Sequence, residues 1–262
     1  MTSVRLVLTD AAWAEMASIL EEIKHKAGRP PEQSDRMFIE AVLYMARTGI
    51  PWRDLPKDFG HWDAVYNRFR RWEARGLWKK LWERLQADDA KRAKHLLIDS
   101  TMIRAHQHAA GALKKNGGQA AQALGRSRGG FSTKIHAGCI NEHTGISIVL
   151  TGGERNDMPG FDEVFAQMPS EHELEDAVMD KGYDSNHIRE TLKEYDINPV
   201  IPPKSNRLEF IEYDRDTYKL REKIERFFNR LKQFRRIATR YDKLGHIFLA
   251  FIHIVASYLI VK

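Results

Sequence analysis

Three acidic residues could bind a metal ion together, although they lie far apart in the sequence. Asp99 follows the apolar run "HLLI" and Asp180 follows "DAVM", and both runs have the length of buried strands. Functional groups in α/β sheets gather at the carboxyl ends of the strands. Two acids there would repel each other unless a shared cation such as Mg²⁺ or Mn²⁺ neutralised them. Each Asp could equally cap a turn or helix, so these two residues alone leave both interpretations open.

The third candidate acid comes from the segment "YKLREKIERFFNRLKQFRR", residues 218–236, a predicted helix with two acids among many basic residues. Glu222 lies almost opposite the apolar face, so we expect it to point to water and to pair with Arg226. Glu225 lies on the flank, where it could overhang the edge of a sheet. Five apolar residues form the face that should pack on that sheet: Leu220, Ile224, Phe227, Leu231 and Phe234.

Glu225 shares its side of this helix with three other polar residues. At 3.6 residues per turn, Tyr218, Arg221, Glu225 and Lys232 fall within a stripe about 60° wide. Such a stripe could be a surface ion-pair helix. It could also combine an acid that has a chemical role with basic neighbours that bind phosphates.

The elements that would position these residues follow an all-helical region. Residues 10–88 read as helices, with Asp10 as the expected first cap. From His95 onward the pattern predicts the order β-β-β-α-β-α-β-α, an antiparallel meander followed by crossover units, and hence an α/β fold with a mixed sheet. The boundary between the two halves is expected near residue 90. Asp157 and Asp184 are interpreted as helix caps.

A basic segment follows Asp99 directly. Residues 100–141 contain no Asp or Glu, so Lys114, Lys115, Arg126, Arg128 and Lys134 are unopposed. The segment could be a flexible solvated loop, but its position beside a candidate acid favours ordering on a phosphate backbone. His106 and His108 in "HQH" are interpreted as part of this DNA-facing loop rather than as a zinc pair.

The helical region carries basic residues off its apolar stripes. We interpret a helix, a turn-like connection containing "PWRDLP" and a following helix as a helix-turn-helix-like DNA-binding unit. The alternative is a small helical bundle whose basic residues face water. Four arginines of the third helix are the candidates for DNA contact: Arg68, Arg70, Arg71 and Arg75.

The composition is that of a globular chain with a mildly basic balance. Among 262 residues, Lys and Arg number 42 and Asp and Glu 36, a net charge of +6 that favours a polyanionic partner. The single cysteine, Cys139, fits a reducing compartment and a buried position. The apolar run from His246 to Ile260 is shorter than a membrane span and predicts a buried helix. The N-terminus shows no signal-peptide pattern, so a cytoplasmic protein without a membrane partner is expected.

A series of motifs along the chain resembles insertion-sequence transposases with an Asp-Asp-Glu (DDE) triad. The spacing Y-x2-R-x3-E-x6-K, here Tyr218, Arg221, Glu225 and Lys232, is similar to the signature of that group. The other motifs resemble the insertion-sequence-five family: "GIPWRDLPKDFGHWDAVYNRFRRWEARG", "LLIDSTMIRAHQHAAGA", "GRSRGGFSTKIH", "DKGYDS" and "FRRIATRYDK". In "LTGGERNDMPG", Glu154 stands where that family would have Gln.

The resemblance implies a ribonuclease-H-like catalytic domain over residues 91–262, preceded by a helical DNA-binding domain over residues 1–90. Asp99, Asp180 and Glu225 would be the catalytic triad and would hold two Mg²⁺ or Mn²⁺ ions. Arg221, Lys232 and Tyr218 would contact DNA phosphates near the triad. The enzyme would be an endonuclease and strand transferase that cleaves DNA at the element's terminal inverted repeats and joins the 3′-ends to target DNA. It would act on the nucleoid as a homo-oligomer, a dimer on DNA.

Two other functions agree with the same residues. A metal-dependent nuclease could use the triad without strand transfer. A DNA-binding regulator would use the acids only structurally, although the polar stripe around Glu225 argues against it. An inactive copy of an element is a further alternative, while the triad and its flanking motifs are intact.

Overall fold

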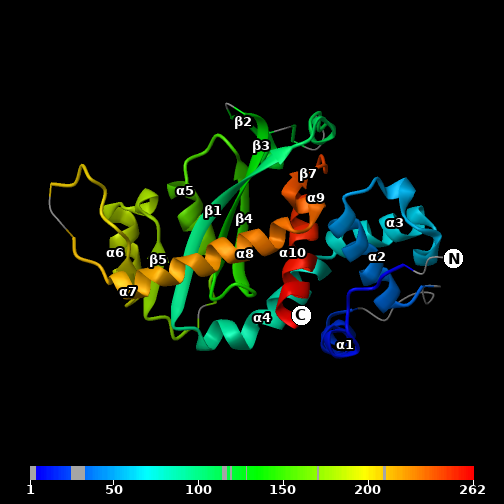
Figure 1. The fold of residues 1–262 in the computed structure, drawn as a ribbon, viewed down its shortest axis with the longest axis horizontal. Helices are drawn as coiled ribbons and strands as arrows, with labels where there is room; N and C mark the ends of the chain where they lie inside the picture. The colour runs from blue at the N-terminus through cyan, green and yellow to red at the C-terminus, as the bar shows by residue number, and fades with distance from the viewer. Residues whose placement is uncertain are drawn as a thin grey trace.

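The helical region expected at the N-terminus is present in the computed structural model, which describes residues 4–24, 33–113, 117–118, 120–127, 129–169, 171–208 and 211–262. Four helices lie at the N-terminal end (Figure 1): α1 (Asp10–Ile23), α2 (Asp35–Thr48), α3 (Trp62–Ala74) and α4 (Leu77–Arg92). Thr9, not Asp10, caps α1, because its side chain accepts from the Ala12 amide. Two short 3₁₀ turns, η1 (Trp52–Asp54) and η2 (Lys57–Phe59), separate α2 from α3. This connection is longer than the three to four residues of a typical helix-turn-helix.

A single mixed sheet follows, with the predicted order of strands. Its main strands run β4 (Gly145–Gly152), β3 (Gly130–Cys139), β1 (His95–Ala105), β5 (Asp176–Met179) and β6 (Asn198–Val200) across the sheet. β3 is antiparallel to both β1 and β4, whereas β5 is parallel to β1 and β6 to β5. Two short strands that the sequence did not indicate extend it: β2 (Gly125–Ser127) pairs with β3, and β7 (Thr239–Arg240) pairs with β1.

Alternation along β1 sends neighbouring side chains to two different hydrophobic layers. Leu97 belongs to a layer that also contains Ile224 and Phe227 of α8 (Glu222–Lys232). Leu96 and Ile98 belong to the opposite layer, with residues of α5 (Met158–Phe165) and α6 (Asn186–Glu194). The sheet is therefore covered on both faces, and α8 crosses over one face in front of β1 (Figure 1).

The predicted long helix over residues 218–236 is present in pieces. The chain is helical through α7 (Arg215–Tyr218), the 3₁₀ turn η7 (Lys219–Arg221) and α8, with Tyr218, Arg221 and Glu222 all in the right-handed region. It becomes extended at Phe234 before α9 (Arg235–Ala238). Phe234 is buried and makes an edge-on contact with Tyr258, so the helix is interrupted where an aromatic side chain enters the core.

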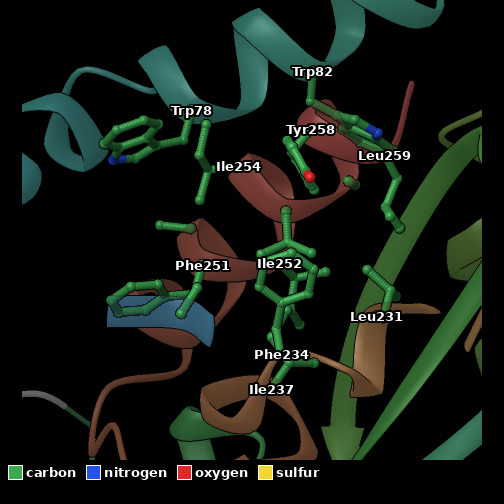
Figure 2. Close-up of a cluster of buried hydrophobic side chains, with 14 of the residues drawn as sticks. Trp78, Trp82, Leu231, Phe234, Ile237, Phe251, Ile252, Ile254, Tyr258 and Leu259 are labelled. Carbon is green, nitrogen blue, oxygen red and sulfur yellow. The ribbon is translucent and has the colours of Figure 1, made fainter. Parts of the chain in front are cut away.

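The C-terminal helix α10 (Gly245–Val261) joins the helical region to the sheet. Its residues lie in one hydrophobic cluster with Trp78 and Trp82 of α4 and Leu231 of α8 (Figure 2). His253 stacks on Trp82, and burial lowers its pKa to about 3. The predicted buried helix is thus confirmed, and no helix in the described ranges is long and apolar enough to cross a membrane. Cys139 is buried as expected.

The hydrophobic core continues across the domain boundary predicted near residue 90. Side chains of α1, α2, α3 and α4 belong to the same hydrophobic cluster as one layer of the sheet. The helical region is therefore packed on the sheet-containing half through α10, and two separate domains remain a prediction.

Candidate active site

The register of two parallel strands brings the first two acids together. Ile98 of β1 is paired with Met179 of β5, so Asp99 and Asp180 are the next residues on neighbouring strands. Strands in a sheet are spaced about 4.8 Å apart. Leu97 and Val178, two residues before each acid, face the layer that contains α8. Asp99 and Asp180 therefore lie side by side at the end of the β5 strand, and Asp99 emerges beneath α8.

Arg221 connects Asp99 to the third acid. Its Nη2 donates to Asp99 Oδ2 at 3.0 Å and its Nη1 donates to Glu225 Oε1 at 2.5 Å. The Asp99 side chain is 14% exposed, whereas that of Glu225 is 53% exposed. The helix thus places Glu225 on the solvent-exposed side of the site, and the Arg221 guanidinium lies between Glu225 and Asp99.

Burial strongly perturbs Asp99. Its pKa is raised to about 6, mainly by desolvation and in part by the negative charge of Asp180, against the lowering effects of the Ser100 amide and Arg221. The Asp180 carboxylate is itself held by the Gly182 amide, which donates to Oδ1 at 2.7 Å, within the turn η6 (Lys181–Tyr183). The two acids are thus close enough to repel each other, which is the penalty that a bound cation would remove.

Lys232 of the polar stripe also lies on this side of β1. Lys232 Nζ donates to Thr101 Oγ1 at 2.6 Å, and Thr101 lies on the same side of β1 as Asp99. Tyr218 is half-buried beside Tyr213, and burial raises its pKa. Glu222 points away and pairs with Arg226 at 3.2 Å, as the sequence predicted. The helical periodicity therefore assigned the stripe and the opposite face correctly.

The carboxylates have the chemistry of a divalent-metal site, but their present arrangement is that of an ion pair. No group of three or more His, Cys, Asp or Glu among the described residues is arranged to hold a metal ion. Arg221 supplies the positive charge between Asp99 and Glu225, and its buried Nε has no hydrogen-bond partner within the described part of the chain. Carboxylate oxygens are the donors that Mg²⁺ and Mn²⁺ prefer. The donor chemistry therefore fits such ions, while the present geometry pairs two of the carboxylates with Arg221.

Two other acids have positions that the sequence did not predict. The Asp157 side chain makes no cap for α5. Instead it accepts from Ser100 Oγ at 2.5 Å and from Lys134 Nζ at 2.9 Å, directly behind Asp99, and these bonds and the Lys134 charge lower its pKa despite partial burial. Asp157 is the N-cap residue of α5 by position, as expected, but its carboxylate bonds to residues of β1 and β3 instead of capping the helix.

Asp184 is likewise no helix cap. Ser185 caps α6 by accepting from the Ile188 amide. The Asp184 carboxylate is fully buried and accepts from Arg189, Arg207 and the Lys204 amide, and these partners lower its pKa to about 2 against the effect of desolvation. It therefore joins α6 to the loop after β6. The sequence placed the cap one residue too early because Asp and Ser are both good caps.

One predicted DNA contact lies in the interior. Arg68 is buried, pairs with Asp35 and lies over the Phe38 ring at 4.2 Å. It joins α3 to α2 and cannot reach DNA in this arrangement, so its assignment as a DNA contact is corrected. Arg70 and Arg71 are exposed on α3, and Arg75 is exposed at its C-cap.

The basic segment after β1 is described only in part. Arg126 is exposed on β2, with its guanidinium 6.0 Å from the centre of the Phe131 ring. Lys114, Lys115 and Arg128 lie outside the described residues. Lys134 is engaged with Asp157 and with the Arg155 carbonyl. His106 Nδ1 accepts from the His108 amide, and its ring lies against Tyr241.

This order of strands, with one aspartate on β1, a second directly after β5 and a glutamate on a helix crossing the sheet, is that of a ribonuclease-H-like fold. A family model described as "Transposase DDE domain" matches residues 90–260, and one described as "Putative transposase of IS4/5 family" matches residues 8–82. The chain therefore belongs to the DDE transposase family, a class of DNA-cleaving and strand-transferring enzymes. This favours an enzyme over a DNA-binding regulator.

Curated relatives agree with the family. An "Uncharacterized protein y4sN" of Sinorhizobium fredii is 44% identical over 96 residues, 36% of this chain and 74% of the relative. An "Insertion element IS402 uncharacterized 16.2 kDa protein" of Burkholderia cepacia is 31% identical over 38% of this chain and 74% of the relative. A "Putative transposase for insertion sequence element IS6501" of Brucella ovis is 28% identical over 48% of this chain and 96% of the relative.

Solved structures show more distant likeness. A piggyBac transposase synaptic complex with hairpin DNA has a TM-score of 0.38 and 14% identity, covering 78% of this chain and 50% of that chain. A pre-cleavage Mos1 transpososome has a TM-score of 0.28 and 11% identity, covering 90% and 81%. The present chain thus spans half the length of the piggyBac chain.

Proposed function

We propose that this transposase binds the terminal inverted repeats of an insertion sequence, cleaves DNA there and joins the 3′-ends to target DNA. Asp99, Asp180 and Glu225 are the catalytic residues and the ligands of two Mg²⁺ or Mn²⁺ ions. The observation that best supports this is the bridge from Arg221 to Asp99 and Glu225, because it brings α8 to the strand edge where Asp99 and Asp180 lie side by side.

The carboxylates and the basic residues of α8 have different tasks. Bound divalent ions would stabilise the entering and leaving oxygens of the phosphoryl transfer. Arg221 and Lys232 lie along one side of β1, where their side chains can bind and orient the DNA phosphates. Tyr218, one turn before Arg221, can hydrogen-bond or stack beside the same phosphates. Most of the rate enhancement then comes from positioning and charge neutralisation.

The helical region binds the terminal repeats. Arg70 and Arg71 are exposed on α3 and Arg75 at its C-cap, and all three can contact phosphates or base edges. Lys114, Lys115, Arg126 and Arg128 belong to the basic segment after β1, which would run along the DNA beside the triad. We assign this division of labour to residues 1–90 and 91–262.

The reaction joins two element ends to one target, so a homo-oligomer, a dimer on DNA, is the simplest assembly. Its substrate is chromosomal and its ions are those of the cell interior. We therefore infer that the protein works in the bacterial cytoplasm, on the nucleoid.

The test is incubation of the full chain with Mg²⁺ or Mn²⁺, labelled DNA carrying the element's own ends, and a supercoiled target plasmid. Cleavage at the ends followed by covalent joining of their 3′-ends to the plasmid is the expected result. Cleavage without joining would instead identify a nuclease. Neither product, with DNA ends still bound, would refute the catalytic proposal.

A further inference from the structure

Asp157, Ser100 and Lys134 form a polar network on the face of β1 opposite to α8. Asp157 follows β4, yet its carboxylate reaches across β3 to β1, where Oδ1 accepts from both Ser100 Oγ and Lys134 Nζ. Lys134 Nζ also donates to the Arg155 carbonyl at 2.7 Å. The Lys134 side chain is only 12% exposed. One ion pair therefore ties the loop after β4 to the two central strands of the sheet.

Ser100 links this network to the catalytic strand edge. It is the residue after Asp99, and its amide donates to Asp99 Oδ1 at 2.7 Å. Its hydroxyl points the other way, to Asp157. The backbone between the two side chains is thus held from both sides, and this fixes one oxygen of Asp99.

The network lies behind the proposed metal ligands and is separate from the contacts of α8. Arg221 approaches Asp99 at Oδ2, whereas the Ser100 amide holds Oδ1. Groups that hold metal ligands from behind commonly control metal affinity, and removing one costs roughly 10- to 100-fold.

We propose that Asp157 is a positioning residue, which acts through Ser100, with Lys134 as its counter-ion, to orient the Asp99 carboxylate for metal binding. This inference rests on the proposed function of Asp99. It gives "ERND", residues 154–157, a role that helix capping does not supply. Asp157 itself contacts neither the metal nor the DNA in this proposal.

The experiment compares Asp157→Asn, Ser100→Ala and Ser100→Thr with the wild-type chain. Asp162→Asn is the matched control, since Asp162 is also an acid of this region but accepts from the exposed His187 at 2.8 Å. Mn²⁺ binding to the free protein is measured by electron paramagnetic resonance. The Mn²⁺ concentration for half-maximal end cleavage and the affinity for end DNA are measured in parallel, with thermal unfolding of each variant.

We expect Asp157→Asn and Ser100→Ala each to weaken Mn²⁺ binding roughly tenfold, with end-DNA affinity unchanged. Ser100→Thr, which keeps the hydroxyl, and Asp162→Asn should bind Mn²⁺ like the wild type. Unchanged Mn²⁺ binding by a folded Asp157→Asn protein would overturn the inference. The inference would also be overturned if Asp157→Asn lost Mn²⁺ binding while Ser100→Ala bound Mn²⁺ like the wild type. Asp157 would then be a direct ligand.

These outcomes are separable from failure of the proposed function. A wild-type chain that binds Mn²⁺ and cleaves, with variants that match it, refutes the positioning role alone. A wild-type chain that neither binds Mn²⁺ nor cleaves refutes the metal-dependent function, and the positioning role with it.

Discussion

Arg221 donates to Asp99 at 3.0 Å, across 122 residues of sequence. The same guanidinium holds Glu225 one helical turn away. In the absence of DNA and metal, this cation is what offsets the negative charge at the strand edge. The proposed binding of a metal ion and of DNA phosphates would therefore each require a change in the partners of Arg221.

Glu225→Gln should abolish end cleavage while leaving affinity for end DNA within about twofold. The amide keeps the shape of the side chain but removes the charge that a divalent ion requires. Gel shift and cleavage assays on the same preparation measure the two properties. Strand cutting by this variant at the wild-type rate would contradict the triad. Glu222→Gln, an exposed acid on the same helix, is the control.

Arg221→Gln should bind Mn²⁺ more tightly than the wild type when DNA is absent, because Asp99 and Glu225 lose the cation that competes for them. The same variant should cleave end DNA poorly, since the guanidinium that would bind a DNA phosphate is gone. Titration of the free protein followed by electron paramagnetic resonance measures the first effect. Weaker Mn²⁺ binding would show that Arg221 supports the carboxylates rather than competing for them.

Asp99→Asn should raise the stability of the free protein at pH 7.5. Burial raises the folded-state pKa of Asp99 to about 6, so the wild type has its full stability below the unfolded-state pKa of about 4 and loses part of it as pH rises through 6. We expect the variant to gain about 1–2 kcal/mol in unfolding free energy at pH 7.5, and the gain to vanish near pH 4. Urea unfolding at both pH values measures this, and a gain that persists at pH 4 would contradict it.

Asp184→Asn should destabilise the fold by about 3 kcal/mol, because it leaves the buried Arg189 without its charged partner. The pKa of Asp184 is lowered to about 2, so its contribution is present above pH 4 and is lost as pH falls toward 2. The difference from wild type should shrink over that window. Asp216→Asn, an exposed acid, serves as the control in denaturant titrations.

The arginines of α3 should divide into two groups. Arg68→Met should lower the unfolding temperature, because Arg68 is buried against Asp35 and Phe38. Arg70→Gln, Arg71→Gln and Arg75→Gln should leave stability unchanged and weaken end binding, with the salt slope of binding falling by roughly 0.9 for each phosphate that the variant no longer neutralises. Salt-dependent binding isotherms and thermal melts test both. If none of the three exposed substitutions changed end binding, α3 would not be the surface that contacts the DNA.

The amino-acid sequence by itself determined the order of the main elements and the polar and apolar sides of the helix over residues 218–232. Alternation in "HLLID" and the helical period of residues 218–232 are local properties, because side-chain direction follows from the backbone conformation of each element. These patterns predicted that Tyr218, Arg221, Glu225 and Lys232 share one side and that Glu222 points to water. The motif spacing then predicted the family.

Only the tertiary structure decided which partners the charged groups have. Asp157 and Asp184 looked like caps, and Arg68 looked like an exposed base, because sequence spacing carries no information about strands and helices that meet from distant positions. The positions of Asp99 and Asp180 are fixed by the pairing of Ile98 with Met179. The position of Glu225 is fixed by the packing of α8 against β1. The burial that results from that packing is what gives Asp99 its raised pKa and Arg221 its bridging place.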